Sequence, residues 1–164
     1  MSTTAAGQGV AARPGIDPRG PQVAAALTAV VLVAVLLLAP GRLAVVLLGA
    51  QAVVFAIGAT WGVQHTPYSW LFRTAVRPRL APPAELEDAR PPQFAQAVGL
   101  GFALVGLLGV AAGVEPLALV AVGFALVAAL LNAVFRLCLG CELYLLIKRT
   151  THRTPRPFLG ARER

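Results

Sequence analysis

Four long apolar runs occupy residues 23–39, 43–63, 97–114 and 117–137, and they leave few possible folds. At about 1.5 Å of rise per residue, a helix of about 20 residues crosses the roughly 30 Å hydrocarbon core of a bilayer. Lipid offers no partner for backbone N–H and C=O groups, so single spans of this kind are helical. Short links around 40–42 and 115–116 join the runs in pairs. The sequence therefore predicts an all-α fold, a four-transmembrane-helix bundle made of two helical hairpins.

The composition excludes the common alternatives. Of the 164 residues, 57% are hydrophobic and 13% are charged, whereas soluble domains carry about 25% charged residues. The same apolar content excludes a disordered chain, although 16 Gly and 13 Pro are present. A cleaved signal peptide does not explain the first run, because Pro40, Gly41 and Arg42 follow it instead of a small-x-small cleavage site.

The basic residues predict the orientation of the spans. If four helices cross the bilayer, the N-terminal arm, the loop at 64–93 and the C-terminal tail lie on one side. These segments hold Arg13, Arg19, Arg73, Arg77, Arg79, Arg90, Lys148, Arg149, Arg153, Arg156, Arg162 and Arg164, and the opposite side holds Arg42. Because segments rich in Lys and Arg stay in the cytoplasm, we expect a multi-pass plasma-membrane protein with both termini cytoplasmic. Attraction to anionic headgroups then explains the net charge of +7, so the expected partner is the lipid bilayer and not nucleic acid.

On this interpretation the chain divides into three parts. Residues 1–15 form a flexible N-terminal arm, residues 16–148 the membrane domain, and residues 149–164 a basic cytoplasmic tail. Within the loop, aromatic and basic residues mix over 67–77, as they do in helices that lie in the headgroup plane, and an acidic turn follows at 82–88. We interpret the loop as a hairpin connector held at the interface rather than as a docking site.

One cluster of residues is a candidate for chemistry: Arg136, Cys138, Cys141 and Glu142. The residues from 117 to 147 would make a helix of about 46 Å, which is longer than a bilayer needs. We therefore expect this helix either to tilt and protrude or to break at Gly140. Ionisable groups at membrane depth are costly, so Arg136 and Glu142 are candidate tuning residues for the two thiols.

The cysteine pair has three possible roles. Cys138 and Cys141 could exchange with a thioredoxin-like protein or carry a persulfide, because a vicinal thiol resolves a mixed disulfide. They could hold a metal together with His65 and His152, but the spacing matches no zinc pattern, and we predict no metal or cofactor site. They could also simply pack, since Cys is often buried. The exchange role meets one objection: reactive thiolates occur at helix N-termini, and these cysteines come late in a predicted helix, unless it restarts near Gly140.

Other features of the spans support less specific functions. Two pairs of glycines lie four residues apart: Gly58 with Gly62, and Gly109 with Gly113. This spacing predicts close packing of helices and is compatible with a homo-oligomer. Four polar residues could line a transport pathway: Gln51, Asn132, Arg136 and Glu142. No G-x-S-x-G, H-E-x-x-H or P-loop motif is present. The leading prediction is a membrane component of a thiol-redox or sulfur-transfer system; the alternative is a non-enzymatic scaffold or small transporter with packed cysteines.

Four short segments add a resemblance to these arguments. They are 15–21 (GIDPRGP), 69–73 (SWLFR), 82–88 (PPAELED) with 92–96 (PQFAQ), and 138–142 (CLGCE). Over residues 16–148 the chain resembles the bacterial membrane family catalogued as domain of unknown function 4395. Because genes of that family often lie near genes for thioredoxin-like or sulfurtransferase proteins, the resemblance implies such a partner for Cys138 and Cys141. The basic tail after Ile147 departs from the family pattern.

Overall fold

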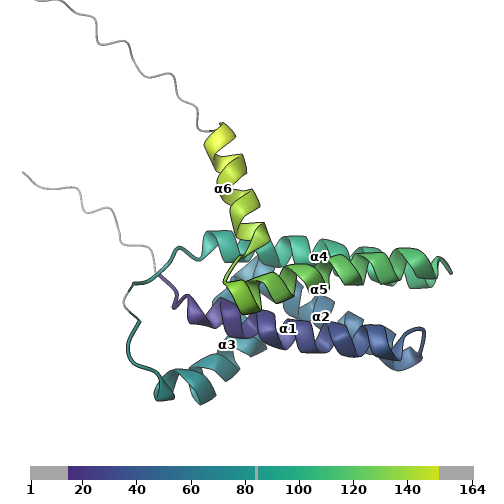
Figure 1. The fold of residues 1–164 in the computed structure, drawn as a ribbon, viewed down its shortest axis with the longest axis horizontal. Coiled ribbons are helices and arrows are strands. Elements are labelled where there is room, and N and C mark those ends of the chain that lie inside the picture. Colours follow the sequence, from purple (N-terminus) through teal and green to yellow (C-terminus); the bar gives the residue numbers. More distant parts are fainter. Residues whose placement is uncertain (1–14, 84, 152–164) are drawn as a thin grey trace, which may run out of the picture.

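The computed structural model describes residues 15–83 and 85–151, which form six α-helices (Figure 1). Four helices are long: α1 (Arg19–Leu38), α2 (Arg42–Trp61), α4 (Arg90–Ala111) and α5 (Glu115–Phe135). Two are short: α3 (Pro67–Leu71) and α6 (Leu139–Thr151). The connector after α2 also contains a 3-10 turn η1 (Val63–His65), a π turn η2 (Phe72–Val76) and a 3-10 turn η3 (Arg77–Arg79). The predicted all-α bundle is confirmed.

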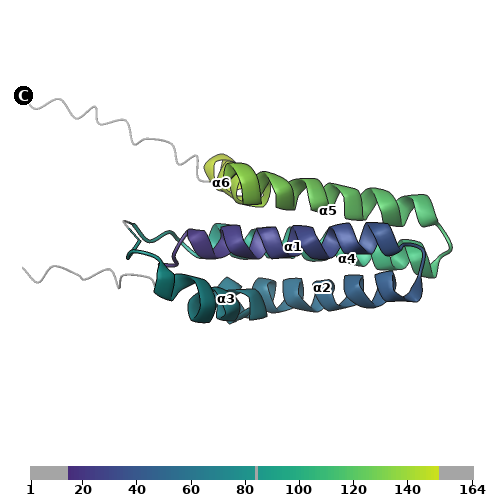
Figure 2. The same ribbon diagram turned by 60° about the horizontal axis from the view of Figure 1, so that its bottom comes forward.

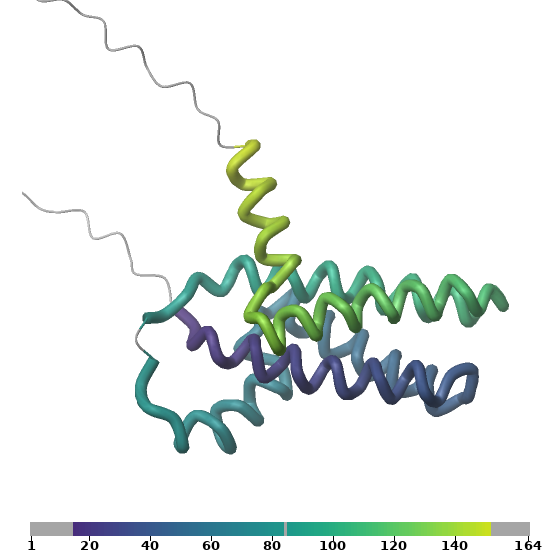
Figure 3. The backbone as a smooth tube through the Cα atoms, in the orientation of Figure 1, coloured from purple at the N-terminus to yellow at the C-terminus, as the bar shows by residue number. Residues whose placement is uncertain are grey.

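The four long helices pack as two antiparallel hairpins (Figure 2). Helix α1 packs against α2 and α5, and α4 packs against the same two helices. All four are long and apolar enough to cross a membrane. The start of α1, the end of α2, the start of α4 and the end of α5 lie together at one end of the bundle (Figure 3). We call this the terminal end.

The distribution of large and small side chains fits a lipid environment. The bundle interior contains many small residues, such as Ala44, Ala103 and Ala121, whereas many large apolar side chains point outward. Leu37 is 80% exposed and Val134 is 66% exposed. In water such a surface would be a liability for aggregation, but hydrocarbon solvates it without cost. The outward face of the bundle therefore matches the interior of a bilayer.

Two of the predicted small residues bring helices together inside the bundle. A Cβ added to Gly58 of α2 would lie 2.7 Å from Cγ of Gln96 in α4. A Cβ added to Gly109 would lie 2.9 Å from the backbone nitrogen of Ala118, across the α4–α5 hairpin. These glycines pack within one chain.

A buried polar group connects α1, α2 and α3. Gln51 is 1% exposed; its Nε2 donates to Oγ1 of Thr28 at 3.4 Å, and its Oε1 accepts from the hydroxyl of Tyr68 at 2.7 Å. Buried polar groups are stable only when they are hydrogen-bonded, and here two protein partners satisfy the amide. Gln51 thus has a structural role, and the phenol of Tyr68 points into the bundle rather than only toward headgroups.

Helices α1 and α4 begin several residues before their apolar runs, and an Asp side chain forms the same turn at the start of each. Oδ1 of Asp17 accepts the backbone N–H of Arg19 at the start of α1, and Oδ1 of Asp88 accepts that of Arg90 at the start of α4, each at 3.0 Å. An Asp side chain that bonds the backbone two residues later forms a turn that leads into a helix. The polar first turns of these helices place charged residues at the terminal end.

Candidate functional site

The site begins where α5 ends. Arg136 follows the last helical residue and adopts a left-handed conformation, with φ 57° and ψ 22°. Its N–H donates to the carbonyl of Asn132 at 3.1 Å, which closes the helix. The left-handed region normally requires Gly, so an Arg there is locally strained by about 1 kcal/mol. Of the two expectations, a continuous helix from 117 to 147 is wrong, and the expected break occurs at residues 136–138 rather than at Gly140, because a left-handed residue cannot continue a right-handed helix.

Helix α6 leaves the bundle sideways (Figure 1) and packs on α4. A Cβ on Gly140 would lie 2.6 Å from Cβ and 2.7 Å from Cα of Ala95, so only Gly allows this approach. The rings of Phe94 and Tyr144 meet with their centroids 5.8 Å apart. Gly140 was expected as a possible helix breaker; instead it lies inside α6 and is the contact point with α4.

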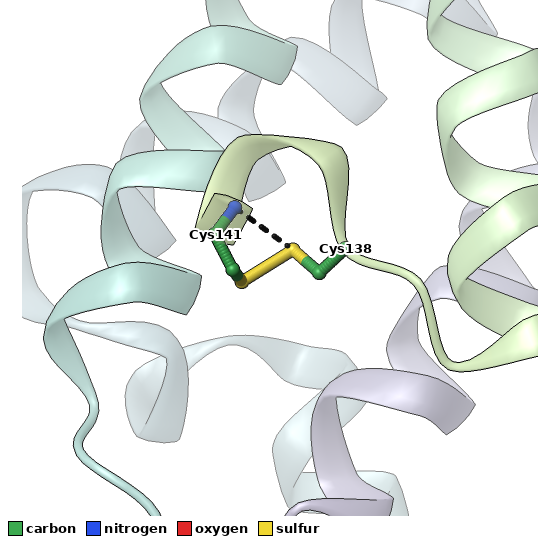
Figure 4. The surroundings of a disulfide bond; sticks show 2 residues. All are labelled: Cys138 and Cys141. Atoms are coloured by element: carbon green, nitrogen blue, oxygen red, sulfur yellow. Dashed lines mark hydrogen bonds between the residues drawn. A yellow bond between two sulfur atoms is a disulfide. The ribbon is translucent and has the colours of Figure 1, made fainter. Parts of the chain in front are cut away.

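Cys138 occupies the cap position directly before α6. Its carbonyl accepts the N–H of Glu142 at 3.0 Å, and its Sγ accepts the N–H of Cys141 at 3.4 Å (Figure 4). This is the bonding pattern of a helix N-cap, with sulfur in the place of the usual oxygen. Cys138 and Cys141 form a disulfide, with their Cα atoms 5.1 Å apart. The motif is therefore a disulfide at the first turn of a helix.

This position removes the objection that the sequence raised. A helix N-terminus carries a partial positive charge, which stabilises a thiolate at the cap. Cys138 lies at that terminus because the chain stops being helical at Arg136 and becomes helical again at Leu139. Once reduced, Cys138 would therefore be the thiol favoured in its ionised form. Cys141 lies within the same turn, bonded to Cys138.

Both sulfur residues line a pocket at the terminal end, which we call the polar pocket. Its volume is about 540 Å³. Its charged wall residues come from four segments: Arg19, Glu85, Glu87, Asp88, Arg136 and Glu142. The acidic loop reaches the pocket because Ile16 and Glu87 form an antiparallel bridge with two backbone hydrogen bonds of 2.9 Å. The pair is thus accessible from a charged surface rather than packed only among Leu and Phe.

A second space lies on the other side of the pair, between α1, α4 and α5; we call it the apolar cavity. Its volume is about 320 Å³, and Phe102, Phe124 and several alanines line it. Cys138 and Asn132 line both spaces, whereas Cys141 lines only the polar pocket. Cys138 therefore stands at the boundary between an aqueous opening and the membrane-spanning interior.

The four predicted site residues come together in the structure, whereas His65, considered as a metal ligand, does not line their pocket. Arg136, Cys138, Cys141 and Glu142 all line the polar pocket. His65 is exposed, and its Nδ1 is hydrogen-bonded to the carbonyl of Trp61 at 2.7 Å, while His152 lies outside the described residues. In the part of the chain that the structure describes, no three His, Cys, Asp or Glu side chains are grouped to hold a metal ion.

Sequence reasoning missed two features of the site. Glu85, Glu87 and Asp88 were interpreted only as a connector, yet they line the pocket beside the disulfide. Asn132 was noticed as polar, but its place between the two spaces was not predicted. An uncharged polar residue close to the end of an otherwise apolar run was the available signal.

These features define a class: a multi-pass helical membrane protein with a disulfide-bonded cysteine pair at one end of its bundle. The family model described as Domain of unknown function (DUF4395) matches residues 16–149, which is most of the chain. The chain belongs to this family. The comparisons with curated proteins and with solved structures found no match.

Proposed function

We propose that this protein is a membrane-bound thiol–disulfide exchange component, and that the Cys138–Cys141 pair accepts electrons from a dithiol protein at the cytoplasmic face. The observation that carries the proposal is the cap position of Cys138, whose sulfur accepts the N–H of Cys141. Thiol–disulfide exchange releases one cysteine as a thiolate, and a helix N-terminus stabilises that thiolate. A purely structural disulfide releases no thiolate and gains nothing from this position.

The charges support the cytoplasmic side for the polar pocket. Among the described residues, Arg19, Arg90, Arg136, Lys148 and Arg149 belong to segments at or beyond the terminal end, and Arg42 begins α2 at the other end. Segments rich in Lys and Arg remain in the cytoplasm. Disulfides in that compartment are mostly transient and catalytic, so a disulfide there favours exchange over a permanent staple.

The exchange proceeds in two balanced steps. A thiolate of the partner dithiol attacks Sγ of Cys141, which lines the polar pocket; a new intermolecular S–S bond forms, and Cys138 leaves as a thiolate. The second partner thiolate then attacks its own partner sulfur in the mixed disulfide, and Cys141 leaves. Two electrons and two protons pass from the partner to Cys138 and Cys141. Arg136 and Glu142 line the same pocket and act as tuning residues for the leaving thiolates.

A thioredoxin-like dithiol tests this proposal directly. The oxidised protein in nanodiscs is mixed with reduced thioredoxin, quenched in acid and labelled with a maleimide polymer that retards free thiols on a gel. We expect Cys138 and Cys141 to become labelled as the thioredoxin is oxidised. Thioredoxin that lacks its resolving cysteine should become bound to Cys141, as identified by mass spectrometry.

The control is the Cys138→Ser/Cys141→Ser double variant, which should leave thioredoxin reduced. A wild-type protein that transfers no more electrons than this control would overturn the exchange function and favour the scaffold alternative. A persulfide on Cys138 or Cys141 after incubation with a sulfurtransferase, in place of electron transfer, would indicate sulfur transfer instead.

A further inference from the structure

The apolar cavity has no role in exchange at the polar pocket, although the same sulfur forms part of its wall. It lies among α1, α4 and α5, inside the part of the bundle that matches the bilayer core. Its volume of about 320 Å³ falls within the range of small-molecule sites, roughly 300–1,000 Å³. Its wall is mostly apolar, as small-molecule sites usually are.

The chemistry of the wall changes along the cavity. Gln96 near the start of α4 and Asn132 near the end of α5 place two amides at the terminal end, next to Cys138. Phe102 and Phe124 line the deeper part, and their stacked rings lie 6.3 Å apart. Asn132 follows Phe124 by eight positions, which is about 12 Å along α5. The cavity therefore suits a molecule with a polar ring at the sulfur and an apolar remainder toward the middle of the bilayer.

The side of the cavity toward lipid offers a route of entry. Phe124 is 61% exposed on the outer face of α5, although it also lines the cavity. Leu143 of α6 is 44% exposed and lines the cavity as well. A ligand dissolved in the membrane can reach these side chains without crossing the polar pocket.

We propose that the apolar cavity binds the ring of a membrane quinone, and that this quinone reoxidises the Cys138–Cys141 dithiol. The inference rests on the proposed exchange function, which leaves a dithiol that must lose two electrons and two protons before the next cycle. An acceptor in the apolar cavity would meet Cys138 and not Cys141, because Cys138 lines both spaces and Cys141 lines only the polar pocket. A quinone is soluble in lipid, accepts two electrons and two protons, and offers two carbonyl oxygens to amide donors such as that of Asn132.

The reaction balances without a further co-reactant. The Cys138 thiolate adds to the quinone ring and forms an S–C bond. The Cys141 thiolate then attacks Sγ of Cys138; the S–S bond forms, and the S–C bond breaks with its electron pair left on the ring. Two protons, equal in number to those lost by the thiols, convert the ring to a hydroquinone. The products are the disulfide and one hydroquinone, and the helix N-terminus at Cys138 favours the thiolate that starts the sequence.

The test uses the reduced full-length protein in nanodiscs under anaerobic conditions, with decylubiquinone as the probe. Its ring is fully substituted, which limits unspecific addition of thiols. We expect loss of the quinone absorbance at one hydroquinone per disulfide formed, and no loss with the Cys138→Ser/Cys141→Ser variant. Failure of this reaction alongside normal exchange with thioredoxin would overturn the quinone inference and leave the exchange function intact, whereas failure of both reactions would overturn both.

A pair of variants tests the location of the site. Ala128→Phe fills the cavity from α5, and Val127→Phe adds a ring at the preceding position, which is 53% exposed and not part of the cavity wall. We expect Ala128→Phe to slow quinone reduction at least about tenfold, which corresponds to about 1.4 kcal/mol, and Val127→Phe to leave it unchanged. If Ala128→Phe fails to fold, Ala25→Leu fills the same cavity from α1. Equal rates in the filled and control variants would overturn the proposed location.

Discussion

The cap position of Cys138 makes the two thiols unequal, and this inequality can be measured on single-cysteine variants. Cys141→Ser leaves Cys138 at the N-cap of α6 and preserves the backbone N–H of residue 141 that Sγ accepts. Cys138→Ser leaves Cys141 in the first turn beside Glu142, with that N–H now directed at a serine. The two variants therefore differ in whether the remaining sulfur is capped, while each removes one thiol.

The expected size of the difference follows from the cap. A helix N-terminus stabilises an anion by about 0.3–1 kcal/mol when exposed and up to about 2 kcal/mol when partly buried. Cys138 is half-buried, so about 1–2 kcal/mol is appropriate, which raises the ratio of thiolate to thiol about 5- to 30-fold. Because nucleophilicity falls as a thiolate is stabilised, with a Brønsted coefficient of about 0.4–0.5, alkylation at neutral pH should be only about two- to eightfold faster for Cys138.

The assay is the rate of iodoacetamide alkylation in detergent as a function of pH, followed by mass spectrometry. We expect the midpoint of the Cys138 profile to lie at lower pH than that of Cys141. Urea-unfolded samples are the control, in which the two midpoints should agree. Identical midpoints in the folded variants, or a lower midpoint for Cys141, would show that the α6 N-terminus does not stabilise the Cys138 thiolate.

Three further predictions concern the supports of the site. Gly140→Ala should lower the free energy of unfolding by about 1–3 kcal/mol because the added Cβ clashes with α4. Gly123→Ala is the control and should leave the free energy of unfolding unchanged, because its added Cβ meets nothing within 4 Å. Thermal unfolding in detergent compares the two variants. Gln51→Leu should cost about 1–3 kcal/mol because it leaves the buried hydroxyl of Thr28 and the half-buried hydroxyl of Tyr68 without their partner, and the same melting experiment measures it. Burial raises the pKa of Tyr68 above its ordinary value of 10.0. The neutral phenol therefore contributes fully to stability below pH 10.0, and this contribution is lost as the pH rises toward the folded-state pKa. Tyr68→Phe should remove this part of the alkaline loss of stability, and an unchanged pH profile would contradict the raised pKa of Tyr68.

The site was only partly predictable from the sequence. Cys138 and Cys141 were visible as a spaced pair, and their company with Arg136 and Glu142 was visible as well, because all four lie within seven residues. Their reactivity depends on which residue begins the last helix. Hydropathy does not reveal that boundary, since apolar residues continue from 117 to 147 through the break. The left-handed Arg136 makes the break, and no turn residue such as Gly marks that position.

The spans themselves were determined by the sequence alone. Lipid satisfies no backbone polar group, so each long apolar run must form a helix, whatever its neighbours are. Tertiary structure decided how the site at the terminal end is arranged. The contact of Gly140 with Ala95 directs α6, and the bridge from Ile16 to Glu87 brings acidic side chains to the cysteine pair. The two spaces that meet at Cys138 are also formed only by tertiary packing. The physical reason is the separation of the interacting residues along the sequence. A helix forms through hydrogen bonds between residues four apart, whereas these contacts join segments that are distant in the chain. Only packing determines which of those segments meet.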